Sequence, residues 1–361
     1  MTVTEANTTG FPGTVTASAP LTVVGGGTTP AITNISPTVG NPTGDTTVTI
    51  TGCNFDGVTS VMFGSTPAVS FTIDSDTQIT AIAPPGTGQV NVILSSSHGT
   101  SPVSIATAFS YGQTGYTLAG SDGGVFNFGG AFHGSLPASH VTPAKPIVGI
   151  ATTSGGGGYW LAGSDGGVFS YGNAGFHGSL AGRKLDGPIV GIAAAPDGGG
   201  YWLVGSDGGV FSFGSATFHG SLGGHPLAKP IVGIAAAPDG NGYWLVGSDG
   251  GVFAFGSATF HGSLAGHALA QPVVGIAPTS DGGGYWLTGS DGGVFGFGSA
   301  TFDGSMAGHT LSKPVVGIVG ATSGGYDLVG SDGGVYAFDT PFGGSLSGRA
   351  LTAPIVGGAS G

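Results

Sequence analysis

Charged and titratable side chains recur in this sequence at a fixed distance from a proline that opens an apolar run. Five residues before that proline stand Arg183, His225, His267, His309 and Arg349, and His140 stands six residues before its own proline. Guanidinium and imidazolium groups bind carboxylates, sulfates and phosphates, and an imidazole gains its charge near pH ~6.5. We call these six residues the His/Arg set and predict that they bind an acidic ligand. The alternative is that duplication of a repeat copied a polar loop residue.

An aspartate recurs in each of six Ser-Asp-Gly-Gly turns. The six are Asp122, Asp165, Asp207, Asp249, Asp291 and Asp332. Because aspartate in such a turn bonds the backbone of that turn, we predict a structural role rather than a ring of cation sites. The turns resemble the Asp-box hairpins of sialidase-like propellers. A sialidase clamps its substrate with three arginines, whereas this chain has only Arg183 and Arg349, so sialidase activity is excluded.

Residues suited to covalent or acid–base catalysis are few. The sequence has no persuasive Gly-X-Ser-X-Gly elbow or Cys/His pair, and Glu5 is its only glutamate. A glycosidase carboxylate pair would have to use aspartates, most of which lie in the repeated turns. We predict no catalytic residue, no cofactor and no metal site, and we favour a protein that is not an enzyme. A secreted hydrolase or lyase acting on a polysaccharide or an ester stays open as the alternative.

Two further sets recur in four of the repeats. They are His133, His177, His219 and His261, each after phenylalanine, and Trp160, Trp202, Trp244 and Trp286, each after tyrosine. Equivalent residues of neighbouring repeats are expected to lie too far apart for tetrahedral metal coordination, so we predict hydrogen-bonded structural histidines. We predict that the tryptophans pack between repeats, with exposed sugar-stacking platforms as the alternative.

The composition favours short strands joined by tight turns, because glycine supplies 78 of 361 residues and charged residues only 7%. The net charge is −12 and no Lys or Arg precedes Lys145, so nucleic acid and anionic membranes are disfavoured as partners. No apolar run is long enough to span a bilayer, so we expect no membrane insertion. The only cysteine, Cys53, is expected to be a small buried side chain.

The spacing of the turn aspartates, 41 to 43 residues, matches a four-stranded blade of a β-propeller better than a rung of a β-solenoid. One repeat predicts strands over 231–236, 243–247, 252–255 and 259–264. The first repeat lacks the Pro-Ile-Val-Gly strand, and the chain supplies it near its end, at Pro354–Gly357. We therefore predict a six-bladed propeller over residues 113–361, whose C-terminal strand closes the first blade and leaves no open sheet edge.

Residues 29–112 are predicted to form a separate domain, with alternating strands such as 47–52 and 58–64. This stretch resembles an IPT/TIG domain, an immunoglobulin-like sandwich. The resemblance rests on Ile35-Ser36-Pro37, Gly52-Cys53-Asn54-Phe55, Val61-Met62-Phe63-Gly64, Ile79-Thr80-Ala81 and Pro84-Pro85-Gly86. Residues 1–28 are interpreted as a linker, or as remnant strands of a preceding immunoglobulin-like domain that could pair with another molecule.

The propeller repeats, with Gly-Tyr-Trp-Leu and Ser-Asp-Gly-Gly-Val-Phe, are similar to repeats of secreted or wall-associated actinobacterial proteins. That resemblance implies an extracellular or cell-surface location rather than an activity. We predict a non-catalytic binding or scaffold protein, in which one face of the propeller recognises a glycan or a cell-surface protein. Besides the hydrolase or lyase, the remaining alternative is a subunit of a surface filament or layer that self-assembles through residues 1–28.

Overall fold

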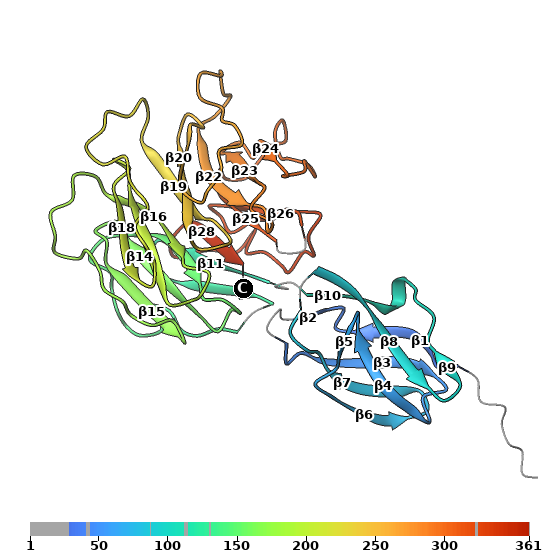
Figure 1. Cartoon of the computed structure of the whole chain (residues 1–361). Helices are drawn as coiled ribbons and strands as arrows, with labels where there is room; N and C mark the ends of the chain where they lie inside the picture. The colour runs from blue at the N-terminus through green and yellow to red at the C-terminus, as the bar shows by residue number, and fades with distance from the viewer. Residues whose placement is uncertain are drawn as a thin grey trace, which may run out of the picture.

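The computed structural model describes residues 29–40, 44–86, 88–111, 115–129, 131–321 and 324–360, and the predicted all-β class is confirmed. The only helix within these ranges is the short 3₁₀ turn η1 (Ile105–Thr107). The strands fall into two groups, residues 31–111 and residues 116–360 (Figure 1). The interpretation of residues 1–28 concerns a segment outside the described residues.

The first group forms an immunoglobulin-like sandwich of two sheets. One sheet has the order β1 (Ala31–Ser36), β3 (Thr47–Cys53), β7 (Gln78–Ile82) and β6 (Ser70–Ser75). The other contains β2 (Val39–Gly40), β10 (Ala108–Tyr111), β8 (Gly88–Ser96), β4 (Val58–Phe63) and β5 (Thr66–Pro67), with β9 (Gly99–Thr100) paired to β8. Inward-facing residues of both sheets, among them Ile50 and Phe109, share one core.

Cys53 is exposed, so the prediction that it is buried is wrong. The reason is the two-residue period of β3, in which Val48 and Ile50 face the core. Cys53 has the opposite parity and therefore lies on the outer side of the strand, with Thr47 and Thr51.

The second group consists of six three-stranded antiparallel sheets with a propeller-like arrangement. Five of them are each formed by three consecutive strands. The first two sheets are β13 (Ile147–Thr152), β14 (Gly158–Gly163), β15 (Val168–Gly172) and β16 (Ile189–Ala194), β17 (Gly200–Gly205), β18 (Val210–Gly214). The next three are β19 (Ile231–Ala236), β20 (Gly242–Gly247), β21 (Val252–Gly256); β22 (Val273–Pro278), β23 (Gly284–Gly289), β24 (Val294–Gly298); and β25 (Val315–Gly320), β26 (Tyr326–Gly330), β27 (Val335–Phe338). The sixth joins both ends of the repeat region: β28 (Ile355–Ser360), β11 (Tyr116–Gly120), β12 (Val125–Phe128).

The first strand of each sheet packs against the first strand of the next, and β28 packs against both β25 and β13. Figure 1 shows the red strand β28 beside the green strand β11. The two strands pair antiparallel, with Leu118 opposite Gly358. The predicted pairing between the terminal strand and the strand that begins at Tyr116 is therefore present.

The predicted fourth strand of each blade is wrong for the described residues, because each sheet has three strands and residues 259–264 form none. The backbone of this outer segment bonds side chains instead of a neighbouring strand. In the preceding repeat, Trp202 Nε1 donates to Thr217 O at 2.8 Å. Tyr243 of the next sheet accepts from His219 N at 3.1 Å and donates to Gly220 O at 2.6 Å.

Tryptophan and tyrosine rings join neighbouring sheets at four junctions, and the packing predicted for the tryptophans is confirmed. Trp202 and Tyr243 are both fully buried, and their ring centroids lie 5.6 Å apart. Equivalent pairs link Trp160 to Tyr201 and Trp286 to Tyr326. Because these tryptophans are buried, they cannot act as exposed platforms for sugars.

Candidate functional site

Each Ser-Asp-Gly-Gly turn joins the second and third strands of its sheet and is closed by its aspartate. Asp207 Oδ1 accepts a hydrogen bond from Gly209 N at 3.1 Å, and the other five turns have the same bond at 2.9 to 3.0 Å. Gly208 has a φ of 78°, which glycine adopts without strain. The structural role predicted for the aspartates is thus confirmed, with one carboxylate oxygen engaged by the turn.

Backbone hydrogen bonds hold the His/Arg set beside these turns. Leu222 N donates to Gly208 O in the turn, and His225 N donates to Leu222 O, both at 2.9 Å. The same pair of bonds positions Arg183, His267, His309 and Arg349. Each member is anchored to the turn of its own repeat, so the set is distributed over one face and not gathered into a single site.

His140 is displaced because its loop is built differently. Its backbone N donates to Pro137 O, and Val141 N donates back to Leu136 O. His140 itself has a φ of 55°, in the left-handed region. The side chain nevertheless lines the same pocket as Asp122, so His140 lies near the turn aspartate of its own repeat.

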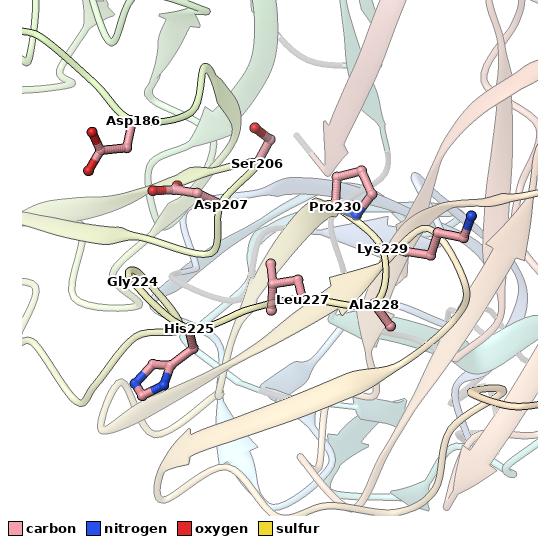
Figure 2. Close-up of a pocket in the computed structure, with 9 residues that line it drawn as sticks. All are labelled: Asp186, Ser206, Asp207, Gly224, His225, Leu227, Ala228, Lys229 and Pro230. Atoms are coloured by element: carbon pink, nitrogen blue, oxygen red, sulfur yellow. The ribbon is translucent and has the colours of Figure 1, made fainter.

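A pocket of about 400 Å³ lies between the turn of β17 and β18 and the loop that leads to β19. It is lined by Asp207 and His225, together with Asp186 and Lys229. Figure 2 shows the carboxylates of Asp186 and Asp207 at one end of this pocket and Lys229 at the other. The equivalent pocket of the first repeat, about 570 Å³, contains Asp122, His140 and Lys145.

The lysines in these pockets belong to six loops that we call the face loops. Each face loop runs from the residue after the turn-bonded Leu or Met to the proline that opens the next strand: 137–146, 181–188, 223–230, 265–272, 307–314 and 347–354. Every Lys and Arg of the chain lies in them, namely Lys145, Arg183, Lys184, Lys229, Lys313 and Arg349. The predicted His/Arg set does not include the lysines, although Lys145, Lys229 and Lys313 each stand directly before a strand-opening proline in the sequence.

The first strands of the six sheets line a central pocket of about 480 Å³, which includes Ile192, Ile234 and Ile276. Its lining residues are apolar or carry hydroxyl groups, and no charged residue is among them. Turns such as that of Asp197 follow these strands. Hydrogen bonds from Gly199 N and the Ser215 hydroxyl lower the pKa of the Asp197 carboxyl.

The second histidine set lies at the boundaries between sheets. His219 packs against the Tyr243 ring, with centroids 5.8 Å apart, and His133 Nε2 lies 3.1 Å from Gly156 O. Nowhere in the described part of the chain do three His, Cys, Asp or Glu residues converge as metal ligands. The predicted packing role agrees with these contacts, and the predicted hydrogen bond is present for the His133 ring. It is wrong for His219 and His261, whose Nε2 atoms are buried without a hydrogen-bond partner.

A ring of exposed phenylalanines was not predicted. The residue before each of these histidine positions is 56 to 62% exposed: Phe132, Phe176, Phe218, Phe260, Phe302 and Phe342. Because Thr217 O and His219 N are both held by buried side chains, Phe218 between them points to solvent. The outer wall therefore carries one accessible aromatic ring per repeat.

Asp327 occupies the tryptophan position in the sheet next to the closing strand. It is 5% exposed, and Thr340 Oγ1 donates to its Oδ1 at 2.6 Å. Burial raises the pKa of the Asp327 carboxyl to about 6. A cavity of about 20 Å³ beside it is lined by Tyr116 and Ser360, so the carboxyl lies at the junction of the first and last repeats.

Comparisons with known proteins concern the fold. A Bacteroides thetaiotaomicron structural-genomics protein of unknown function has a TM-score of 0.42 and 13% identity, over 83% of this chain and 95% of its own. The β-propeller domain of Myceliophteria thermophila Cps50 (Swd1) has a TM-score of 0.40 and 13% identity, and the match covers 58% of this chain and 70% of that domain's chain. No curated protein matches the chain. None of the described helices could cross a membrane.

The family of IPT/TIG domains matches residues 30–111. This range coincides with the two-sheet sandwich from β1 to β10. Residues 30–111 are therefore an IPT/TIG domain.

Proposed function

We propose that residues 113–361 form a six-bladed propeller closed by β28, in a non-catalytic extracellular or cell-surface protein that binds an acidic glycan through the face loops. The IPT/TIG domain then acts as a spacer that presents this face. The proposal concerns binding alone, because the pockets of the face loops combine carboxylates and hydroxyl groups with cations, which suits recognition of a polar, charged ligand.

One observation carries the proposal: all six Lys and Arg residues of a chain with net charge −12 lie in the face loops. An anionic ligand is repelled by the net charge of the chain, and it is attracted only where cations are concentrated. The loops also hold His140, His225, His267 and His309, all exposed. A protonated imidazole attracts an anion and a neutral one does not, so the attraction for an anion should increase at mildly acidic pH.

A glycan and cell-wall array at pH 5.5 and 7.5 tests the proposal. We expect acidic glycans to bind more strongly at pH 5.5, and a variant with His225, His267 and His309 changed to Ala to lose that increase. His98→Ala is the matched control, because His98 is exposed but lies in the IPT/TIG domain. Absence of acidic-glycan binding at both pH values, or an equal loss in the His98→Ala control, would refute the proposed function.

A further inference from the structure

The lysines that directly precede a strand-opening proline alternate from one repeat to the next. The residue before the strand-opening proline is, in chain order, Lys145, Gly187, Lys229, Gln271, Lys313 and Ala353. The three loops with lysine directly before the proline each carry histidine in the His/Arg set, whereas two of the other three carry arginine. The six repeats thus contain three copies of one combination: Asp122, His140, Lys145; Asp207, His225, Lys229; Asp291, His309, Lys313.

We infer that these three combinations are three corresponding binding pockets on alternate repeats, each of which takes one acidic sugar unit. The inference rests on the proposed function and adds the number of sites, their positions and the class of ligand. Pockets are present in the structure at two of the three positions, beside Lys145 and beside Lys229. The third combination has the same turn and loop bonds, since Met306 N donates to Gly292 O and His309 N to Met306 O.

The chemistry of the pocket beside Lys229 points to a ligand that carries hydroxyls and a negative charge together. Asp186 and Asp207 lie at one end, where carboxylate oxygens accept hydrogen bonds from hydroxyl groups (Figure 2). Lys229 lies at the other end, where an ammonium group donates to an anion. A simple anion satisfies only the cationic end, and a neutral sugar only the acidic end, whereas a uronic acid satisfies both.

The size and position of the pocket agree with this ligand. A volume of about 400 Å³ lies within the range of small-molecule sites, roughly 300 to 1,000 Å³, and accommodates a short saccharide. The walls are fixed by backbone bonds, because Ile231 N donates to Ser206 O and Ser206 N donates to Pro188 O. Only the charged side chains have to be ordered when the ligand binds.

In the intervening repeats the same position cannot supply the charge. Gln271 has an amide that donates a hydrogen bond without a charge, and Gly187 and Ala353 donate none from a side chain. Arg183 and Lys184 are adjacent in their loop, at the start of the face loop and not before its proline. Lys184 is therefore a lysine on the same face that lacks the pocket combination, and it serves as an internal control.

Lysine labelled with carbon-13 at Cε gives four signals in this chain, which Lys→Gln variants assign. The probe is digalacturonate, compared with uncharged digalactose and with inorganic sulfate. We expect digalacturonate to shift the signals of Lys145, Lys229 and Lys313 with dissociation constants within about twofold of one another, and to leave Lys184 unshifted. Digalactose and sulfate at the same concentration should give less than about a tenth of the shift.

Two variants test the role of the lysine itself. Lys229→Gln, which copies the natural residue at 271, should lower the number of digalacturonate sites found by calorimetry from about three to about two and leave the shifts of Lys145 and Lys313 unchanged. Gln271→Lys should add a further signal that shifts with digalacturonate. If all four natural lysines shift alike, or if only one shifts, the three-pocket inference is wrong.

The outcomes separate this inference from the proposed function. Acidic glycans that bind on the array without shifting the three lysines would overturn the inference and leave the proposed function standing. Equal shifts with sulfate would overturn the sugar class and leave a face that binds anions. No array binding together with no lysine shift would refute both.

Discussion

Replacing Asp327 by asparagine should stabilise the protein at neutral pH and remove part of its pH dependence. The Asp327 side chain is buried at the junction of the first and last repeats, in the position that tryptophan fills in four other repeats. Its burial disfavours the charged form and raises the pKa from the ordinary 3.8 to about 6. Asparagine has nearly the same shape, carries no charge, and still accepts the hydrogen bond from Thr340 Oγ1.

The sign and size of the effect follow from that pKa. The folded state binds the proton more tightly than the unfolded chain, so stability increases as the pH falls from about 6 to about 4. Above pH 6 the Asp327 carboxyl is charged in both the folded and the unfolded state, so the free energy of unfolding is lower by the whole cost of burying that charge. A difference of about two pKa units, at ~1.36 kcal/mol each, gives at most about 3 kcal/mol. In a domain of this size that corresponds to a change in Tm of at most about 6 to 12 °C.

Thermal unfolding of Asp327→Asn and the unchanged protein at pH 7.5 and pH 4.5 measures this effect. We expect a higher Tm for the variant at pH 7.5 and a difference of only about a third of that size at pH 4.5, where the Asp327 carboxyl is protonated in the folded state but mostly charged in the unfolded chain. The control is Asp339→Asn, because Asp339 is exposed and has a φ of 51°, which asparagine also tolerates. If the variant has a lower Tm at pH 7.5, or the same increase in Tm at both pH values, then the buried charge of Asp327 does not destabilise this junction.

Three further predictions concern the bonds that join the repeats. Tyr243→Phe should lower the free energy of unfolding by about 1 to 3 kcal/mol in a denaturant melt, because two backbone groups lose their hydrogen-bond partner. The control Tyr171→Phe should leave that free energy unchanged, because equivalent positions of other repeats hold phenylalanine. Gly220→Ala should destabilise more than Gly224→Ala, because both have positive φ but only the first places a Cβ 2.7 Å from a Phe255 ring carbon; equal losses would contradict this. Deleting Ile355–Ser360 should abolish the main thermal transition, because β11 loses its partner, and an unchanged calorimetric trace would refute that role.

The repeat spacing predicts the second and third strands well because both lie beside strong local signals. Tyr243 begins an apolar run, and Asp249-Gly250-Gly251 supplies the turn that a two-residue hairpin needs. The terminal strand could be predicted for the same reason, since Ile355-Val356-Gly357 copies the first strand of the other repeats. These elements depend on local sequence and on repetition, which are visible without a structure.

The outer segment was predicted incorrectly because its partners are distant in sequence. Alternation over 259–264 is typical of a strand, but the groups that bond such a segment are a tryptophan indole 15 residues earlier and a tyrosine hydroxyl more than 20 residues later. The spacing of apolar residues in the sequence does not indicate when a backbone group bonds a side chain of the next sheet. The exposure of Phe260 follows from the same bonds and could not be predicted without them.

The face loops show which differences among repeats the fold does not explain. Leu222, Gly208 and Tyr243 have counterparts in nearly every repeat, and each makes a bond or contact that the sheets need. Lys229 is exposed, and its counterparts include glycine, glutamine and alanine, so the fold tolerates several chemistries there. Surface substitutions of this kind usually change stability by less than about 0.5 kcal/mol. Packing therefore does not determine where the lysines lie, and their positions are available for the binding proposed for this face.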